Sequence, residues 1–183
     1  MGARKSKRDT KASTHLGRRW LRGALEVGVV LLIFVLVSAW QTRKLLPDDG
    51  RPAPAFQLVD LAGRSVRLAD YQGKTTLLHF WATWCGVCRQ EFSALNAVHS
   101  GLDDDQAVLT IVADSEDPER VRRFVRERGL AYPVLLATAD VLKSYRVKAF
   151  PTNYYIDKDG RLRETTVGLS TRFSMQARMG CAK

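Results

Sequence analysis

The chain of 183 residues has few of the side chains from which disulfide frameworks and metal sites are built: three cysteines and three histidines. Three cysteines are too few to hold together a small disulfide-rich domain, which the composition therefore excludes. A zinc site needs about four ligands, but only Cys85 and Cys88 are closely spaced, which argues against a structural metal. With 45% hydrophobic residues, the chain is expected to fold as one domain with an appendage.

The formal net charge of +10 is unevenly distributed. Residues 1–44 hold ten lysines or arginines against two acidic residues, which gives +8, and the other 139 residues contribute only +2. A nucleic-acid-binding protein is expected to carry a basic face on its folded domain. Because the folded part is close to neutral, we predict no nucleic-acid partner.

An apolar stretch follows the basic segment, between residues 20 and 40. At about 1.5 Å per residue such a helix spans a hydrocarbon core of roughly 30 Å, and the basic residues before it orient that end to the cytoplasm. We therefore predict a basic cytoplasmic segment (1–23), a single transmembrane anchor in the bacterial inner membrane (24–40) and a domain in the periplasm or an equivalent extracytoplasmic space. The alternative is a cleaved signal peptide, because residues 37–39 (Val-Ser-Ala) have the small-residue form of a cleavage site.

Residues 41–54 are rich in proline, glycine and aspartate, which indicates a linker before a domain at 55–180. In that domain, short runs of β-forming residues alternate with helical patterns, as in a sheet covered by helices. The predicted strands are 56–59, 65–68, 75–81, 106–113, 133–136, 153–156 and 162–167. The predicted helices run from Cys88 to a stop at Gly101, from Pro118 to a stop at Gly129, and over a short piece at 141–145.

The two closely spaced cysteines lie in the string Trp84-Cys85-Gly86-Val87-Cys88, directly after a predicted strand and before a predicted helix. Two intervening residues let both sulfurs meet across the first helical turn, where the helix N-terminus favours a thiolate. We predict that Cys85 is the exposed nucleophile and that the more shielded Cys88 attacks the mixed disulfide and releases the reduced partner. This position favours redox chemistry over half of a zinc site, and we expect no metal.

Three further observations carry a resemblance to a known family: the strings 80–89 (FWATWCGVCR), 52–63 (PAPAFQLVDLAG) and 150–152 (FPT). Together they resemble the membrane-anchored thioredoxin-like proteins of bacteria, the group of TlpA, ResA and the cytochrome c maturation thiol reductase DsbE. Residues 18–22 and 167–178 are most similar to the copper-sensitivity suppressor D branch of that group.

The resemblance implies an α/β thioredoxin-like fold, a central mixed β-sheet flanked by helices with an N-terminal β-hairpin extension, after one transmembrane helix. It also implies that the Phe150–Pro151 peptide bond is cis and lies opposite the cysteines, where its loop pairs with an extended strand of the partner. Trp81 is expected in the core. The residues expected to form or support the substrate groove are Trp84, Gly86, Val87, Phe150, Pro151 and Thr152.

The implied activity is that of a thiol-disulfide oxidoreductase of the protein-disulfide reductase type, which exchanges electrons with the cysteines of protein substrates. We expect a reductant that receives electrons from an upstream membrane donor and needs no dissociable cofactor beyond its Cys85–Cys88 pair. A specific role in cytochrome c maturation ranks second, because the loop after Pro151 lacks the glutamate found in those reductases.

Two other functions on similar folds fit less well. Copper-handling proteins use a CxxxC pair with a distant histidine, whereas this pair is CxxC and no histidine follows His99. Peroxidases of the peroxiredoxin type place a threonine where this chain has Ala82.

Two titratable residues near the cysteines have more than one interpretation. His79 lies six residues before Cys85, where thioredoxins place a buried aspartate; it is either a proton relay or a packed core histidine. Glu91 matches an acidic residue frequent in the family; it is either part of the relay or a complement to the helix dipole. Cys181 is interpreted as a frayed tail thiol, with a disulfide between chains as the alternative.

Overall fold

The computed structural model describes residues 26–29, 32–33 and 49–182. The predicted basic segment 1–23 and most of the predicted anchor 24–40 lie outside these residues. The described parts of the anchor are helical and exposed. Within the described ranges, no helix combines the length and the apolar character that crossing a membrane requires.

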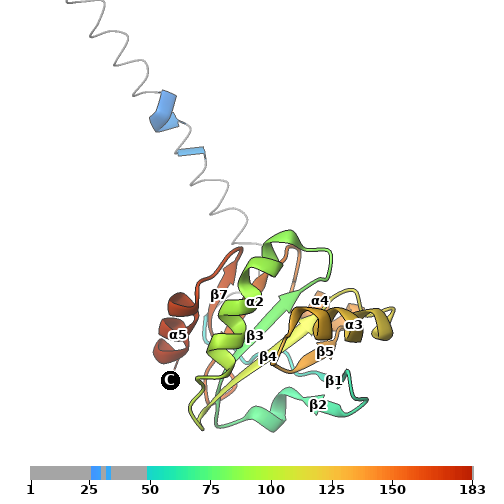
Figure 1. Cartoon of the computed structure of the whole chain (residues 1–183). Helices are drawn as coiled ribbons and strands as arrows, with labels where there is room; N and C mark the ends of the chain where they lie inside the picture. The colour runs from blue at the N-terminus through green and yellow to red at the C-terminus, as the bar shows by residue number, and fades with distance from the viewer. Residues whose placement is uncertain (1–25, 30–31, 34–48, 183) are drawn as a thin grey trace, which may run out of the picture. The chain divides into compact units, whose positions relative to one another are not determined.

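The folded part is built on a seven-stranded mixed sheet with the strand order β2-β1-β5-β4-β3-β6-β7 (Figure 1). β3 pairs in parallel with β4 and antiparallel with β6, and β1 and β2 form the predicted N-terminal hairpin. The strands are β1 (Gln57–Asp60), β2 (Ser65–Arg67), β3 (Thr75–Trp81), β4 (Gln106–Val112), β5 (Val134–Leu136), β6 (Thr152–Ile156) and β7 (Leu162–Val167). The predicted mixed sheet is confirmed, and each predicted strand is present within two residues of its expected ends.

The central strand β3 is buried along its whole length. Because successive side chains of a strand point to opposite faces, Leu77 and Trp81 enter one hydrophobic cluster while Leu78 and Phe80 enter the other. Trp81 is completely buried, as predicted. The sheet therefore has a core on each face, and β3 carries the chain through both cores to the cysteines.

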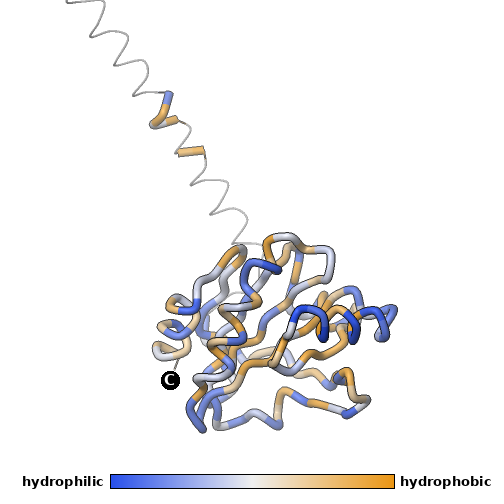
Figure 2. Tube along the Cα trace, viewed as in Figure 1, coloured by the Kyte–Doolittle hydropathy of each residue, from blue (hydrophilic) through white to orange (hydrophobic). Residues whose placement is uncertain are grey.

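Helices cover both faces of the sheet. Residues of α2, α3 and α5 pack in the cluster that contains Trp81, and residues of α4 pack in the cluster that contains Phe80. The helices are α2 (Gly86–His99), α3 (Pro118–Arg128), α4 (Ala139–Ser144) and α5 (Arg172–Cys181), with a 3-10 turn η1 at Leu68–Tyr71. Figure 2 shows most of α3 in the hydrophilic colour, in keeping with its half-exposed position.

The ends of α3 are where its sequence signals place them. The Asp117 carboxylate accepts a hydrogen bond from the Arg120 N–H at 3.0 Å, and Pro118 occupies the first turn, where its missing N–H is not needed. Gly129 ends the helix at φ 60°, a left-handed conformation that favours glycine. The prediction for this helix is confirmed at both ends.

Of the predicted linker 41–54, the structure describes residues 49–54. The Gly50 N–H donates to the Leu162 carbonyl at 3.1 Å, and the Ala53 N–H donates to the Gly160 carbonyl at 2.8 Å. This segment of the predicted linker is thus bound to the hairpin of β6 and β7. Proline content indicated a break in helix, but it could not reveal which backbone groups would pair.

The C-terminal helix α5 was not predicted. Met175 and Met179, one turn apart, are buried against the same face of the sheet as α2. Cys181 is an exposed free thiol and the last residue of this helix. The helix buries only a narrow apolar stripe, which is a weak signal in ten residues.

Candidate active site

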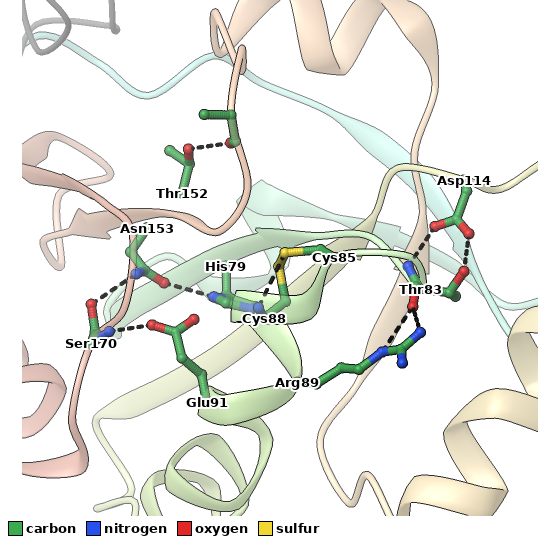
Figure 3. The surroundings of a disulfide bond; sticks show 11 residues. His79, Thr83, Cys85, Cys88, Arg89, Glu91, Asp114, Thr152, Asn153 and Ser170 are labelled. Atoms are coloured by element: carbon green, nitrogen blue, oxygen red, sulfur yellow. Dashed lines mark hydrogen bonds between the residues drawn. A yellow bond between two sulfur atoms is a disulfide. The ribbon is translucent and has the colours of Figure 1, made fainter.

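Cys85 and Cys88 form a disulfide at the N-terminus of α2, with their Cα atoms 5.3 Å apart. The helix starts at Gly86, two residues earlier than predicted, and Cys85 is its N-cap residue. The Cys88 N–H donates to the Cys85 sulfur at 3.1 Å (Figure 3). Sulfur occupies the place of a capping oxygen here, so a negative charge on Cys85 is favoured by an N–H that has no partner within the helix and by the helix dipole.

The two sulfurs differ in access. Cys85 is 6% exposed and Cys88 is completely buried, so the predicted order of exposure is right although Cys85 is largely covered in the disulfide form. The intervening Gly86 and Val87 are exposed. A partner therefore approaches the disulfide from the Cys85 side.

Aromatic side chains lie beside the disulfide. Trp84 is 64% exposed and meets Phe150 edge to face, with ring centroids 5.7 Å apart. The Phe150–Pro151 bond is cis, as the resemblance implied. The Pro151 carbonyl accepts the Gly168 N–H at 2.9 Å, and the buried Thr152 hydroxyl donates to the backbone of the loop. The predicted groove residues thus divide into an exposed apolar rim and a buried support.

His79 lies on β3 and is completely buried. Its Nδ1 is 2.7 Å from the Asn153 Oδ1, and its Nε2 has no hydrogen-bond partner. Burial lowers the pKa of His79 to about 4, although the bond to Asn153 acts in the opposite direction. The imidazole is therefore neutral near pH 7, and so low a pKa makes it a weak proton acceptor there.

Asn153 connects His79 to the residues beside α2. Its amide Nδ2 donates to the hydroxyl oxygens of Thr166 and Ser170, each at 3.3 Å. The Ser170 N–H in turn donates to Glu91 Oε1 (Figure 3). Sequence reasoning missed Asn153 and Ser170; the one available signal was an asparagine in a strand of otherwise apolar and hydroxyl residues.

Glu91 is completely buried in the second turn of α2, so the interpretation as a complement to the helix dipole is wrong. Glu91 follows Cys88 by three residues, so the helical repeat places both side chains on the same inward face of α2. Burial raises the pKa of Glu91 to about 7, while the hydrogen bonds from Ser170 act in the opposite direction. Its Oε2 has no hydrogen-bond partner. A carboxyl group that exchanges a proton near neutral pH is thus held one turn from the buried sulfur.

Metal ligation has no geometric support in the described ranges. No group of three or more histidine, cysteine, aspartate or glutamate side chains there is arranged to hold a metal ion.

A mixed sheet with helices on both faces, and a redox-active cysteine pair capping a helix beside a cis-proline loop, define a thioredoxin-fold thiol-disulfide oxidoreductase. The sequence pattern of the AhpC/TSA family matches residues 50–165. The chain belongs to this family and, within it, to the thiol-disulfide oxidoreductases similar to TlpA, ResA and DsbE.

Individual relatives agree with this assignment. The chain is 31% identical to the thioredoxin-like protein YneN of Bacillus subtilis over 170 residues, covering 88% of this chain and 97% of that protein. It is 33% identical to the thiol-disulfide oxidoreductase ResA of Geobacillus thermodenitrificans over 140 residues, covering 76% and 80% of the two chains. Among solved structures, the exposed lipoprotein thioredoxin of Streptococcus pneumoniae superposes with a TM-score of 0.60 at 31% identity, covering 69% and 98%.

Proposed function

We propose that this protein is a membrane-anchored, periplasm-facing reductase of protein disulfides. The observation that carries the catalytic part is the Cys85–Cys88 pair, with Cys85 capping α2 and Cys88 completely buried. The basic, then apolar, N-terminal sequence supports the anchor and its orientation. The direction of electron flow rests on the resemblance to the TlpA, ResA and DsbE group.

The reaction proceeds in two exchanges. The Cys85 thiolate attacks one sulfur of a substrate disulfide, which forms a mixed disulfide and releases one substrate thiolate. Cys88 then loses its proton and attacks the Cys85 sulfur, which releases the second substrate thiolate. The substrate gains two electrons and takes up two protons, while Cys85 and Cys88 become a disulfide. An upstream membrane donor reduces this disulfide again, and no dissociable cofactor is needed.

Glu91 is proposed as the acceptor of the Cys88 proton, and His79 as a neutral residue of the same relay. Glu91 lies one helical turn from Cys88, and its pKa of about 7 suits proton exchange at neutral pH. His79 is linked to Glu91 through Asn153 and Ser170. Replacing His79 with phenylalanine tests its part, because an unchanged pH profile of thiol exchange removes His79 from the relay.

Trapping tests the order of attack. In Cys88→Ser the second exchange cannot occur, so mixed disulfides between Cys85 and substrate proteins should accumulate on non-reducing gels. Cys181→Ser is the matched control, since it removes the other described thiol far along the chain and should leave insulin reduction unchanged. Full insulin-reducing activity in Cys85→Ser would contradict the assignment of the nucleophile.

The reduction potential tests the direction. Equilibration with glutathione redox buffers, followed by thiol alkylation, gives the fraction of reduced Cys85 and Cys88. A potential more reducing than that of glutathione supports the reductase, because electron transfer from the cysteine pair to substrate disulfides is then favourable. Each difference of about 30 mV corresponds to ~1.4 kcal/mol in a two-electron exchange. A potential as oxidising as that of secretory compartments would overturn it. The role in cytochrome c maturation and the link to copper tolerance stay as narrower alternatives, decided by the proteins trapped on Cys88→Ser.

A further inference from the structure

All polar groups of Thr83, two residues before Cys85, are held by other elements. Its N–H donates to Asp114 Oδ1 at 2.9 Å, and its hydroxyl donates to Asp114 Oδ2 (Figure 3). Its carbonyl accepts from Arg89 Nη2 at 2.8 Å and Nε at 3.3 Å. Thr83 is itself buried. The N–H, the carbonyl and the hydroxyl of this residue in the turn into the active site are therefore all hydrogen-bonded.

Asp114 reaches this turn because β4 runs parallel to β3. Trp81 and Val112 are partners in the last register of the two strands, and the Ala113 N–H donates to the Trp81 carbonyl at 2.8 Å. Both chains leave the sheet at the same edge, so Asp114 lies next to the turn. Its side chain is only 15% exposed, which makes an unpaired charge there unfavourable.

Arg120, from the first turn of α3, completes the arrangement. Its Nη2 is 3.0 Å from the Thr83 hydroxyl oxygen and 3.3 Å from Asp114 Oδ2. The guanidinium thus balances the carboxylate that holds Thr83. The cluster of Thr83, Asp114, Arg89 and Arg120 ties the turn to β4, α2 and α3 together.

We propose that Asp114 is a positioning residue for thiol-disulfide exchange, which holds Thr83 so that Cys85 caps α2 and Trp84 faces Phe150. The turn itself is short: the Cys85 N–H donates to the Ala82 carbonyl at 3.1 Å, so Thr83 and Trp84 are its two central residues. Rotation of Thr83 would move both Trp84 and the Cys85 sulfur. This proposal rests on the proposed function for its effect on substrate, but its effect on Cys85 is independent of it.

Thr83→Val and Thr83→Ser form the test pair. Valine has nearly the shape of threonine without the hydroxyl, while serine keeps the hydroxyl and should behave as the parent. In full-length protein, we expect Thr83→Val to reduce insulin about tenfold more slowly, which corresponds to ~1.4 kcal/mol. Glu116→Gln is the control for a nearby exposed acidic residue and should leave the rate unchanged.

The pH profile of Cys85 alkylation separates positioning from mere stabilisation. It is measured in a background with Cys88→Ser and Cys181→Ser, so that Cys85 is the one thiol. Thr83→Val should move the Cys85 midpoint upwards, toward about 8.5 for a free cysteine, because the thiolate is less well placed at the helix N-terminus. A lowered unfolding temperature with an unchanged midpoint and insulin rate would overturn the proposal.

Asp114→Asn keeps the inference testable if Thr83→Val does not fold. Loss of one negative charge near Cys85 would by itself lower the midpoint. An amide offers Thr83 one acceptor oxygen where the carboxylate offers two, and this weaker positioning of Thr83 should raise the midpoint. An upward shift therefore supports the proposal, and a downward or absent shift contradicts it. If the parent chain fails to reduce insulin, the proposed function fails, while the alkylation midpoints still decide the role of Asp114.

Discussion

Replacing Glu91 with glutamine should change how stability depends on pH. The ordinary pKa of a glutamate is 4.5, and burial raises that of Glu91 to about 7 in the folded protein. Between these values the folded state holds a proton that the unfolded state has released, so the carboxyl lowers stability as pH rises. At 1.36 kcal/mol per pH unit the gap corresponds to ~3 kcal/mol, fully expressed above about pH 7.

His79 acts in the opposite direction in the same pH range. Its pKa is lowered from 6.5 to about 4, so the unfolded state binds the extra proton and stability is lost as pH falls through this range. The size of this contribution is also ~3 kcal/mol by the same conversion. In the parent protein the two contributions to stability nearly cancel between about pH 4 and pH 8. In Glu91→Gln only the contribution of His79 remains, so stability should rise with pH over this range.

Urea unfolding of the oxidised protein at several pH values, followed by tryptophan fluorescence, measures this effect. The difference in unfolding free energy between Glu91→Gln and the parent should move by ~3 kcal/mol in favour of the variant from about pH 4 to pH 8. Glu127→Gln, on the exposed face of α3, is the matched control and should follow the parent curve. A constant separation between Glu91→Gln and the parent would refute the claim that the buried carboxyl retains its proton.

Two further substitutions give simpler outcomes. His79→Phe should show the reverse slope, with stability falling by ~3 kcal/mol from about pH 4 to pH 8 relative to the parent, and a flat difference would show that the folded imidazole titrates normally. Tyr145→Phe removes the hydrogen bond from the Tyr145 hydroxyl to the Pro54 carbonyl at 2.7 Å, far apart in sequence, and should lower the unfolding free energy by about 1 kcal/mol in urea titrations. An unfolding free energy of Tyr145→Phe equal to that of the parent would mean that water replaces the hydroxyl at the Pro54 carbonyl.

Features that depend on neighbouring residues were predictable. Asp117, Pro118 and Gly129 bound α3 because capping acts within a few residues of the helix end. β3 was predicted to the residue because its β-forming side chains stand in an unbroken run between a glycine-lysine turn and the cysteine string. α5 was not predicted because only two of its side chains, both methionines, are buried, and they are buried through contact with the rest of the core cluster.

Partners far apart in the sequence were not predictable. His79 and Asn153 are 74 residues apart, Glu91 and Ser170 are 79 apart, and Thr83 and Asp114 are 31 apart. Each pair meets because strand pairing or helix packing joins its two segments. Such long-range contacts leave no signal in the local sequence around either residue.

The sequence by itself determined where the chemistry takes place, because two residues between Cys85 and Cys88 at the start of a helix bring the sulfurs together whatever surrounds them. Only the tertiary structure decided the protonation of the groups around that pair. Glu91 and His79 would titrate normally in water, and their pKa values shift because α2, β3, β6 and the segment before α5 enclose them. Desolvation depends on every atom that replaces water, and those atoms come from distant parts of the chain.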